Sequence, residues 1–481
     1  MVTNTNNKRS AQWLALHFPH LALDQHNRTR EHEQENTPQA ITDSLAGRQC
    51  IIDHNQAAER VGIHIGMPVG TALSLSDSLR LSPRNQRAEQ AALKRLASWC
   101  YQYSSQVCIV TQRNSLLLEV AGSQCLFGNA ENLTERLCTE LKQLGYQSAS
   151  GIAPTPEAAH LAARHGLHIR TVGAIRSHIG TLSIDSLNLP PASIKALKKM
   201  GFRTVAEILR LPVKALSRRL GLAVSGYLER LLGQRPDPCK TFHPSNNFST
   251  GMDLPDTEST QGLIFPLNRL IQELCGVLRA HDRGIQTLQI DLQIGDSTET
   301  IHLNLHQTTR SESHLMMLLS ERLDRLQLSH PARRISLQAL NFLPCKVIQA
   351  SLLDPVDKPS TATDSTIIER LQARLGAESV KGIKGLQDHR PEHSWALREL
   401  DDAATCAARP DRPAWLLPAP QRCRIDNYRI LKGPERIESG WWDGKDCRRD
   451  YFVVRDSSGS TLWAFHEYKP HPGWYLQGLF S

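Results

Sequence analysis

Short apolar runs alternate with amphipathic segments over the first 170 residues of the chain. Residues 13–19 and 50–52 are apolar runs of strand length, and residues 24–47 between them are polar and predict no element. The apolar positions of residues 85–99 recur at i, i+4, i+7 and i+8, which predicts one helix face. Two β-rich runs, 107–111 and 115–120, flank a polar turn and predict a hairpin. The pattern predicts one α/β or α+β domain up to about residue 170.

Residues 187–232 have a different pattern, with short helices interrupted by proline and glycine. The helix–turn–helix spacing of residues 194–209 is that of a helix-hairpin-helix unit, and such units hold nucleic-acid phosphates with backbone N–H groups. The first turn contains Pro190 and Pro191, and proline has no N–H to donate. We therefore expect weakened phosphate binding at that turn.

Residues 248–344 predict a small β-α-β-β-α-β unit. Apolar residues alternate strictly with polar ones over 287–294, the pattern of a strand with one wet face, and again over 301–305. Residues 267–278 and 314–326 have helical spacing, and 335–342 is strand-like. The composition of residues 354–365 is that of a linker.

The last part of the chain, residues 367–481, is rich in tryptophan. Two strand-like runs, 451–455 and 461–465, flank a turn at Asp456–Gly459, so we expect a compact, mostly β module. Two interpretations of the tryptophans stay open: they form its core, or they form a partner-binding surface, since tryptophan is enriched at interface hot spots. Six of the eight tryptophans lie here: Trp395, Trp415, Trp441, Trp442, Trp463 and Trp474.

Length, composition and charge limit the classes of protein to which the chain can belong. The 481 residues are long enough for about three domains at roughly 150 residues each. A mean hydropathy of −0.37 and the lack of a membrane-length apolar run argue against an integral membrane protein. Eleven cysteines without a C-x-x-C pair, and no apolar leader, predict reduced thiols in the cytoplasm. The net charge of +8 permits a polyanionic partner without requiring one.

Two motifs resemble those of the Y-family translesion DNA polymerases. Residues 62–68 (GIHIGMP) are similar to that family's G-V-x-x-G-M-P turn, and residues 149–153 (ASGIA) to its S-x-G-I-A passage. The resemblance covers roughly residues 13–345. It implies an α+β multidomain fold with a palm and fingers at 1–170, a helix-hairpin-helix thumb at 171–240 and a β-α-β-β-α-β little finger at 241–348.

The tail narrows this resemblance. Residues 433–444 (GPERIESGWWDG) are similar to the C-terminal signature of the ImuB family, the polymerase-like branch of the UmuC/DinB superfamily found in bacterial mutagenesis cassettes. That family is regarded as lacking polymerase activity. The resemblance implies a clamp-binding motif and linker at 349–366 and a partner-binding module at 367–481.

The positions that match the family's catalytic carboxylates carry none. Phosphoryl transfer to a 3′ end uses two Mg²⁺ ions held by carboxylates on adjacent strands, because Mg²⁺ takes oxygen ligands. The family's D-x-D pair falls at His17 and Pro19, and its Asp-Glu pair falls at Asn114 and Ser115. The resemblance therefore implies a protein without catalytic residues, bound metal or cofactor.

Two further observations bear on activity. The family's nucleotide-holding Y-x-A-R matches residues 56–59, where Glu59 replaces the arginine, and its nucleotide-side lysine falls near Pro156. The remaining acids that could relocate a metal site are Asp24, Asp53 and Glu119. An active polymerase with atypical ligands is thus the alternative. A transition-metal site at His17 and His20 is the less favoured interpretation, since two histidines alone are more often structural.

A polymerase-like chain without chemistry can still bind DNA and the sliding clamp. Residues 349–353 (QASLL) resemble the clamp-binding pentapeptide, in which Gln349 would hydrogen-bond at the pocket rim while Leu352 and Leu353 fill an apolar cleft. Arginines would give salt-sensitive phosphate contacts, the alternative being solvated surface charge. The candidates are Arg203, Arg283, Arg310, Arg333 and Arg334.

The ImuB resemblance implies further partners. They are damaged or primer-template DNA, the sliding clamp (beta subunit), an ImuA-like RecA-related protein and an error-prone replicative-type DNA polymerase. The expected docking residues are Trp441, Trp442, Trp463 and Trp474. We expect a non-catalytic adaptor in the cytoplasm, associated with the nucleoid and with no membrane contact. The alternatives are the active polymerase and a generic DNA-binding repair module.

Overall fold

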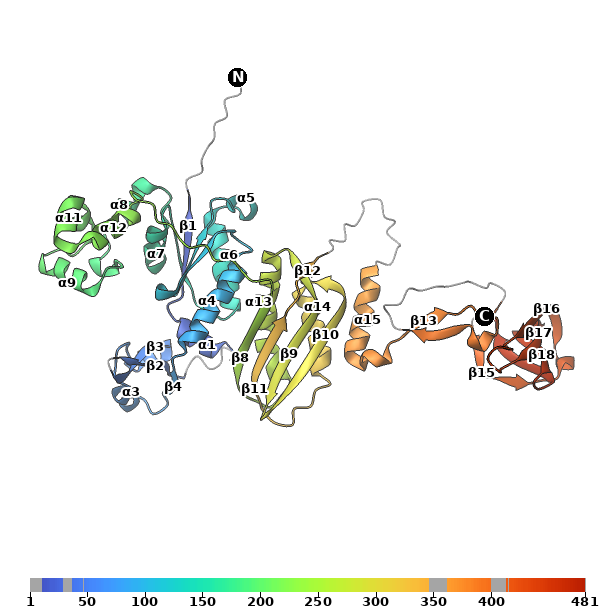
Figure 1. Ribbon diagram of the computed structural model, residues 1–481. Coiled ribbons are helices and arrows are strands. Elements are labelled where there is room, and N and C mark those ends of the chain that lie inside the picture. Colours follow the sequence, from blue (N-terminus) through green and yellow to red (C-terminus); the bar gives the residue numbers. More distant parts are fainter. Residues whose placement is uncertain are drawn as a thin grey trace, which may run out of the picture. The chain divides into compact units, whose positions relative to one another are not determined.

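The protein divides into two compact units, residues 1–374 and 375–481. The structure is a computed structural model and describes residues 11–28, 37–45, 47–345, 361–398, 412–413 and 415–480 (Figure 1). It is α+β, with a mostly β C-terminal unit, as the sequence predicts. Among the described residues, no helix combines the length and the apolar character needed to span a bilayer.

A four-stranded sheet in the order β5-β6-β1-β7 lies at the centre of the first 170 residues. β1 pairs antiparallel with both β6 and β7, and the predicted hairpin is present as β5 and β6. Successive side chains of β1 enter opposite cores: Leu14 and Leu16 pack with α4 and α6, whereas Ala15 packs with α7. The elements are β1 (Trp13–His17), α4 (Gln86–Cys100), β5 (Val107–Val110), β6 (Ser115–Glu119), α5 (Gln124–Phe127), α6 (Ala130–Gln143), β7 (Ala149–Ala153) and α7 (Pro156–His165).

A smaller sheet, β3-β2-β4, was only partly predicted. The polar stretch 24–47 contains the end of α1 and all of β2, because β2 is held by strand partners on both sides rather than by apolar alternation. The G-x-x-x-G-M-P turn follows: Gly66 has φ +88°, and its N–H donates to the Ile51 carbonyl at 2.7 Å. The elements are α1 (Leu21–Asn27), β2 (Gln39–Leu45), β3 (Arg48–His54), α2 (Gln56–Arg60), α3 (Val69–Leu75) and β4 (Arg80–Pro83).

Among the described residues, five short helices follow, as the proline and glycine spacing predicts. Their apolar side chains belong to the same apolar cluster as Ala15 of β1, through Ile175, Leu197, Ile208 and Leu228. They are α8 (Val172–Gly180), α9 (Pro191–Lys199), α10 (Val205–Leu209), α11 (Val213–Leu220) and α12 (Leu222–Leu231).

The predicted β-α-β-β-α-β unit is confirmed. Its sheet has the order β10-β9-β11-β8, and the apolar positions of β9 pack against α13 and α14 while Thr287, Gln289 and Asp291 line the opposite face. The elements are β8 (Phe248–Thr257), α13 (Gln261–Ala280), β9 (Arg283–Ile294), β10 (Ser297–Thr309), α14 (Glu312–Leu323), β11 (Ala332–Ala339) and β12 (Leu343–Pro344).

This unit shares its core with the first 170 residues. One continuous apolar cluster includes Leu96 and Trp99 of α4 and Leu270 and Leu274 of α13. A Cβ at Gly276 would come within 2.0 Å of the Trp99 ring, so α13 approaches α4 as closely as glycine allows.

Charged groups are buried at the same junction. Arg28 Nη2 donates to Glu273 Oε1 at 2.5 Å, and the two side chains are 1 % and 2 % exposed. Arg95 approaches the other Glu273 oxygen at 3.6 Å. Arg269 of α13 donates to the carbonyls of Gln143 and Arg28, and burial lowers its pKa to about 10.

The predicted linker is shorter than expected. Helix α15 (Thr361–Leu375) begins five residues before the predicted end of the linker at 366. Its Glu369 accepts hydrogen bonds from the His306 amide at 2.6 Å and from His314 Nε2 at 2.7 Å, and Ala373 joins the shared core. These contacts attach α15 to β10 and α14, so the second unit starts at residue 375 rather than at 367.

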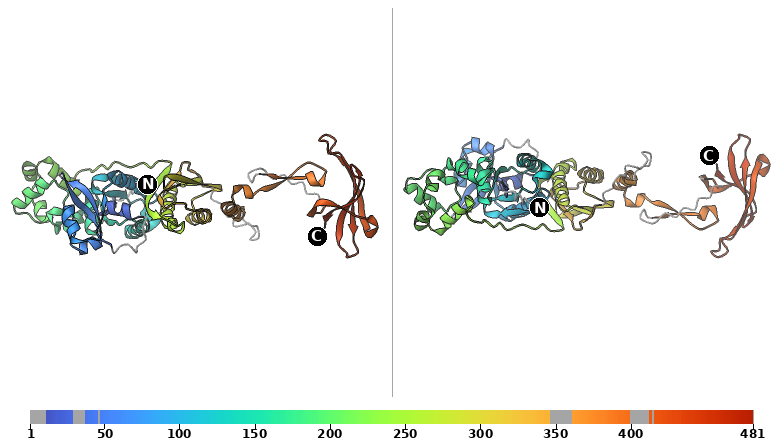
Figure 2. Two further views of the ribbon diagram at one scale, coloured as in Figure 1. Left: turned by 90° about the horizontal axis from the view of Figure 1, so that it is seen from below. Right: turned by 90° about the horizontal axis from the view of Figure 1, so that it is seen from above.

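The second unit is built on a curved five-stranded antiparallel sheet, β15-β19-β18-β17-β16 (Figure 2). Ile437, Tyr451, Trp463 and Phe465 form an apolar cluster on one face, and Val454, Leu462 and Ala464 form another on the opposite face. The elements are β13 (Gly382–Gly385), β14 (Trp395–Arg398), β15 (Trp415–Arg422), β16 (Arg429–Ser439), β17 (Cys447–Arg455), β18 (Thr461–Lys469) and β19 (Gly473–Leu479).

Glu273→Gln should lower the free energy of unfolding of the first unit by about 3–5 kcal/mol, because it leaves the buried Arg28 guanidinium without a counter-charge. Urea denaturation of the full chain measures it. Glu131→Gln is the matched control, because its partner Arg170 is exposed and the loss should stay below about 1 kcal/mol. Equal effects of the two substitutions would contradict a structural role for the buried pair.

Candidate functional site

The four predicted catalytic positions lie together at one end of the central sheet. His17, the last residue of β1, is the cross-strand partner of Ser115. Asn114 precedes Ser115 in a left-handed turn (φ +45°), and its carbonyl accepts the Phe18 N–H at 2.9 Å. Pro19 follows in the turn that leads to α1. Residues far apart in sequence therefore meet where two strands end.

The side chains at this position are engaged with one another. His17 Nδ1 lies 3.0 Å from the Arg113 carbonyl and 3.2 Å from Ser115 Oγ, and that hydroxyl donates to the same carbonyl at 2.7 Å. Burial lowers the pKa of His17, so the ring is neutral at pH 7. The group is a closed hydrogen-bonded cluster, without a carboxylate among the four predicted positions.

His160 of α7 packs against this cluster and was not predicted. Its ring lies edge-on to His17 with centroids 6.0 Å apart, and burial lowers its pKa to about 3. Its Nδ1 is buried without a hydrogen-bond partner. In the described part of the chain, no group of three or more His, Cys, Asp or Glu residues is arranged to hold a metal ion. The helical spacing of α7 alone gave no signal that His160 faces His17.

Arg113 fixes the turn from the other side. Its guanidinium makes a bidentate ion pair with Glu157, at 2.8 and 3.1 Å. Glu157 is positioned by the start of α7, where the Thr155 hydroxyl caps the helix by accepting the Ala158 N–H and buried Pro156 occupies the first turn. The predicted nucleotide-side position, Pro156, is thus part of a helix cap.

Two of the three acids considered as relocated ligands lie near His20. Asp53 accepts from His20 Nδ1 at 2.7 Å and from the Leu23 N–H at 3.3 Å. Asp24 accepts the Gln147 N–H at 2.9 Å, and burial raises its pKa to about 7. The pair with Asp53 raises the pKa of His20. Both carboxylates are committed to histidine or backbone donors.

Glu119 lies at the opposite end of β6. It is the cross-strand partner of Trp13, four residues from Ser115 and hence about 13 Å along the strand. Its carboxylate accepts the Ala121 N–H at 3.1 Å. It cannot join Asp24 or Asp53 at the predicted site without rearrangement of the sheet.

Residues 56–59 form the first turns of α2, capped by Asn55, whose side chain accepts the Ala58 N–H at 2.9 Å. Ala57 and Ala58 are buried, and Glu59 is exposed. The helix places a negative charge at the position matched to the family's arginine.

The predicted DNA-contacting arginines fall into two groups. Arg310, Arg333 and Arg334 make ion pairs with Asp282, Asp256 and Asp253 at 2.7, 3.2 and 2.5 Å. Arg203 and Arg283 are exposed and make no ion pair within the described ranges. Three of the predicted arginines therefore have an exposed aspartate as an ion-pair partner, and phosphate contact by all five stays a prediction.

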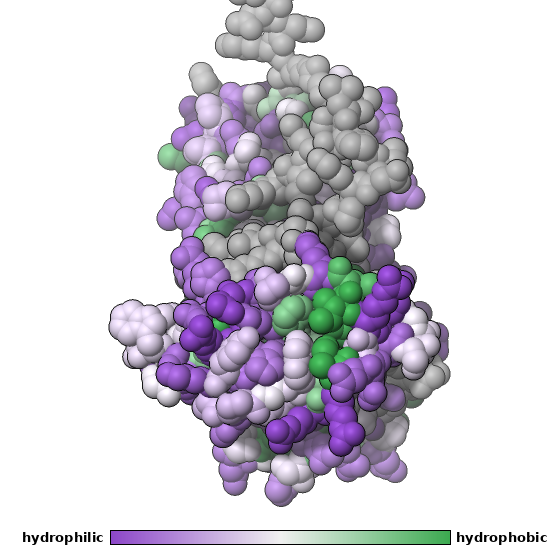
Figure 3. All heavy atoms as spheres, turned by 90° about the vertical axis from the view of Figure 1, so that its right-hand side faces the viewer, coloured by the Kyte–Doolittle hydropathy of each residue, from purple (hydrophilic) through white to green (hydrophobic). Residues whose placement is uncertain are grey.

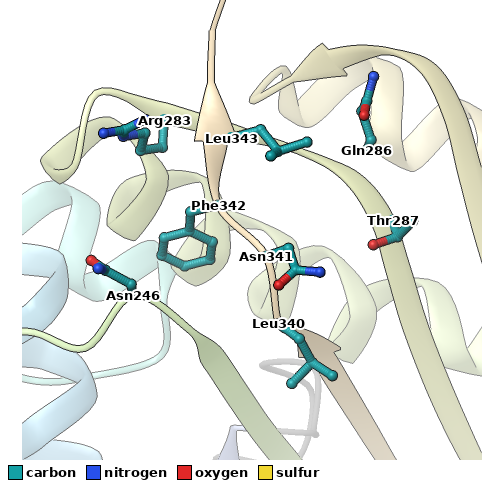
Figure 4. Close-up of a pocket in the computed structure, with 8 residues that line it drawn as sticks. All are labelled: Asn246, Arg283, Gln286, Thr287, Leu340, Asn341, Phe342 and Leu343. Carbon is teal, nitrogen blue, oxygen red and sulfur yellow. The ribbon is translucent and has the colours of Figure 1, made fainter.

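A pocket of about 540 Å³ lies beside Arg283, between β9 and the β11–β12 connection. Figure 4 shows that its polar groups do not converge: Arg283 and Asn246 lie on one side of the connection, and Gln286 and Thr287 on the other. The hollow is an open surface depression rather than an enclosed small-molecule site.

The proline turn before α9 is as expected. Pro190 is the N-cap residue and Pro191 the first residue of the helix. Gly201, with φ +88°, ends the helix, and its N–H donates to the Lys198 carbonyl at 3.0 Å. That N–H is therefore also engaged within the turn.

The predicted clamp-binding and partner-binding residues differ in whether the structure describes them and in how exposed they are. Gln349, Leu352 and Leu353 lie outside the described residues. Trp463 is 2 % exposed and stacks on Tyr451 at 4.2 Å, so it belongs to the core and not to a docking surface. Trp441 and Trp442 are 80 % and 59 % exposed. The core interpretation therefore holds for Trp463, and partner binding by the exposed Trp441 and Trp442 stays a prediction.

The chain matches one protein family over part of its length and individual proteins over longer stretches. The impB/mucB/samB family matches residues 23–164. Protein ImuB of Caulobacter vibrioides is 26 % identical over 459 residues, which cover 88 % of this chain and 100 % of that protein. DNA polymerase IV of Citrobacter koseri is 25 % identical over 190 residues, or 38 % of this chain and 54 % of that protein.

Solved structures with similarity include DinB from Sulfolobus solfataricus and an insertion ternary complex of Dbh DNA polymerase. Both are 16 % identical, cover 69 % of this chain and 99 % of their own, and have TM-scores of 0.40.

The sequence matches define a protein related to the Y-family polymerases. More particularly, the chain is ImuB-like, since the similarity to ImuB extends over nearly the whole length of both proteins.

Asp24→Asn should stabilise the protein above pH 7. The pKa of Asp24 is about 7 in the folded protein, so as pH rises above about 4 the carboxyl ionises first in the unfolded chain. The free energy of unfolding of the wild-type protein therefore falls as pH rises from about 4 through 7. The increase in the free energy of unfolding of Asp24→Asn over wild type should reach at most about 4 kcal/mol at pH 8 and vanish near pH 4. Urea denaturation at both pH values measures it, and a gain independent of pH would contradict the assignment.

Proposed function

We propose that this chain is a non-catalytic adaptor in DNA-damage-induced, error-prone translesion synthesis. It binds DNA and the sliding clamp, and it bridges an ImuA-like RecA-related protein and an error-prone replicative-type polymerase that performs the synthesis. The similarity to ImuB over the length of the chain supports this role.

The observation that carries the proposal is the closed cluster at the end of β1. Two-metal phosphoryl transfer needs carboxylate oxygens on adjacent strands. Here the adjacent strand ends present His17 and Ser115, hydrogen-bonded to each other and to the Arg113 carbonyl. Neither side chain offers a charged oxygen to Mg²⁺.

The alternative, an active polymerase with relocated ligands, has weaker support. It would require Asp24 and Asp53 to give up the Gln147 N–H and the His20 ring, while Glu119 lies at the far end of β6. A DNA-binding repair module unrelated to polymerases does not account for the similarity to ImuB and DNA polymerase IV.

DNA binding in this proposal depends on arginines that are free to meet phosphate. Arg203→Ala combined with Arg283→Ala should weaken binding to primer-template DNA and reduce the slope of log affinity against log salt by about 2, roughly one for each lost phosphate contact. Titration by fluorescence anisotropy at several salt concentrations measures it.

The matched control is Arg136→Ala with Arg170→Ala, which removes the same charge from exposed arginines paired with Glu140 and Glu131. It should leave the slope unchanged. An identical slope for all three proteins would contradict phosphate contact by Arg203 and Arg283.

Clamp binding in this proposal depends on residues 349–353. Replacing Gln349, Leu352 and Leu353 together by alanine should abolish capture of the purified sliding clamp, because the rim hydrogen bond and both apolar anchors are lost. Pull-down with the full-length chain tests it. The triple variant should melt at the wild-type temperature, and normal clamp capture by it would disprove the assignment.

The partner-binding role belongs to the C-terminal unit in this proposal. Trp441 and Trp442 are exposed, and the Trp442 ring lies 5.7 Å from the Arg390 guanidinium, which Asp388 and Asp443 hold at 2.8 and 2.7 Å. This rigid exposed pair has the composition of an interface hot spot.

A further inference from the structure

Four aromatic side chains form a continuous row on one face of the C-terminal sheet. His466 is the cross-strand partner of Trp474 on β19 and of Asp450 on β17. Phe452 and Tyr468 lie two residues further along β17 and β18, so their side chains point to the same face. We call Phe452, His466, Tyr468 and Trp474 the aromatic row.

The rings contact one another across three strands. Centroid distances are 5.3 Å for Phe452–Trp474, 5.1 Å for His466–Trp474 and 4.6 Å for His466–Tyr468. Tyr468 is 43 % exposed, and the other three are partly exposed. Interplanar angles of 44–72° leave ring faces that are not stacked on each other.

The backbone is shaped to hold this row. Gly433 has φ +135°, and a Cβ there would come within 2.7 Å of Phe452 Cδ1. Asp450 is buried beneath the row and accepts a bidentate pair from Arg436, at 2.7 and 2.7 Å, and the Tyr468 hydroxyl at 3.2 Å.

Cationic groups border the row. The guanidinium carbons of Arg448 and Arg436 lie 5.6 and 5.9 Å from the Tyr468 ring centre, and the two side chains are 48 % and 52 % exposed. Exposed Lys469 is the cross-strand partner of Arg448. Arg436 is paired with buried Asp450, and Arg448 is paired with exposed Glu438 at 2.6 Å.

Phe452 also packs against an apolar cluster of the fold, whereas Tyr468 and Trp474 belong to neither cluster of the described C-terminal residues. The other part of the same face is covered by the chain itself, where Ile425 and Tyr428 pack on Val454, Leu462 and Ala464. The opposite face has its own core around Tyr451 and Trp463. Figure 3 shows a hydrophobic patch among hydrophilic side chains on the face that it draws, where on this colour scale histidine, tyrosine and tryptophan are not among the hydrophobic residues.

We propose that the aromatic row, with Arg436 and Arg448, binds single-stranded nucleic acid. Every base has a π-face that stacks on an aromatic ring, and adjacent guanidinium groups bind the backbone phosphates. Arg436, Arg448 and Lys469 against Asp450 and Glu438 leave a net positive border, which favours an anionic occupant. The row of ring faces favours nucleic-acid bases over an acidic peptide. The site lies in the C-terminal unit and is independent of the DNA contacts proposed for Arg203 and Arg283.

Tyr468→Ala and Arg448→Ala, each in the full-length chain, test the proposal. We expect each to weaken binding of fluorescein-labelled oligothymidylate and oligouridylate at least about fivefold by anisotropy, since stacking on one ring carries that much affinity. Affinity for duplex DNA should stay unchanged. Tyr468→Phe, which keeps the ring, should bind single strands like wild type.

Trp415→Ala is the matched control, because Trp415 is exposed in the same unit but lies outside the row. Binding of either oligonucleotide supports the site, and the tighter of the two identifies DNA or RNA as the source. Wild-type affinity in Tyr468→Ala, or an equal loss for single strands and duplex, would overturn the proposal. So would a wild-type chain that binds neither single strand, which would leave the row as a protein-docking surface.

Discussion

The first unit depends on the buried contact between Arg28 and Glu273. Both groups are removed from water, where an unpaired charge is costly, so the folded chain must bring α13 to the end of α1. The same approach buries Trp99 against Gly276 and merges two sets of apolar residues into one core. Residues 248–344 are therefore held against the central sheet by packing as well as by the chain connection.

That arrangement leaves a cluster of side chains at one end of the central sheet. The adjacent ends of β1 and β6 carry His17 and Ser115, with Arg113, Glu157 and His160 around them. Burial lowers the pKa values of both histidines, and the charges of Arg113 and Glu157 are paired with each other. What remains accessible is surface chemistry: exposed arginines, exposed tryptophans and the aromatic row.

Much of the fold could be predicted from the sequence, because periodic burial determines it. Strict alternation in β9 and helical spacing in α4 and α13 each correspond to a face packed on a core. β2 could not be predicted, since pairing on both edges rather than an apolar face holds it. The start of α15 fell in the predicted linker and its remainder in the predicted C-terminal module, because its attachment through Glu369 depends on two histidines far away in sequence. The candidate catalytic positions were assigned through motifs and stay a prediction. Their neighbour His160 and the aspartates paired with Arg310, Arg333 and Arg334 come from tertiary contacts that no local pattern encodes.

The central claim, a polymerase-related scaffold without polymerase chemistry, is tested most directly by primer extension with the purified chain alone. Undamaged and lesion-containing templates would be supplied with Mg²⁺ or Mn²⁺, beside a catalytically competent Y-family polymerase. We predict no nucleotide incorporation, because His17 and Ser115 replace the carboxylates that two-metal transfer needs. Incorporation that disappears in Asp24→Asn or Asp53→Asn would contradict the account and identify a relocated metal site.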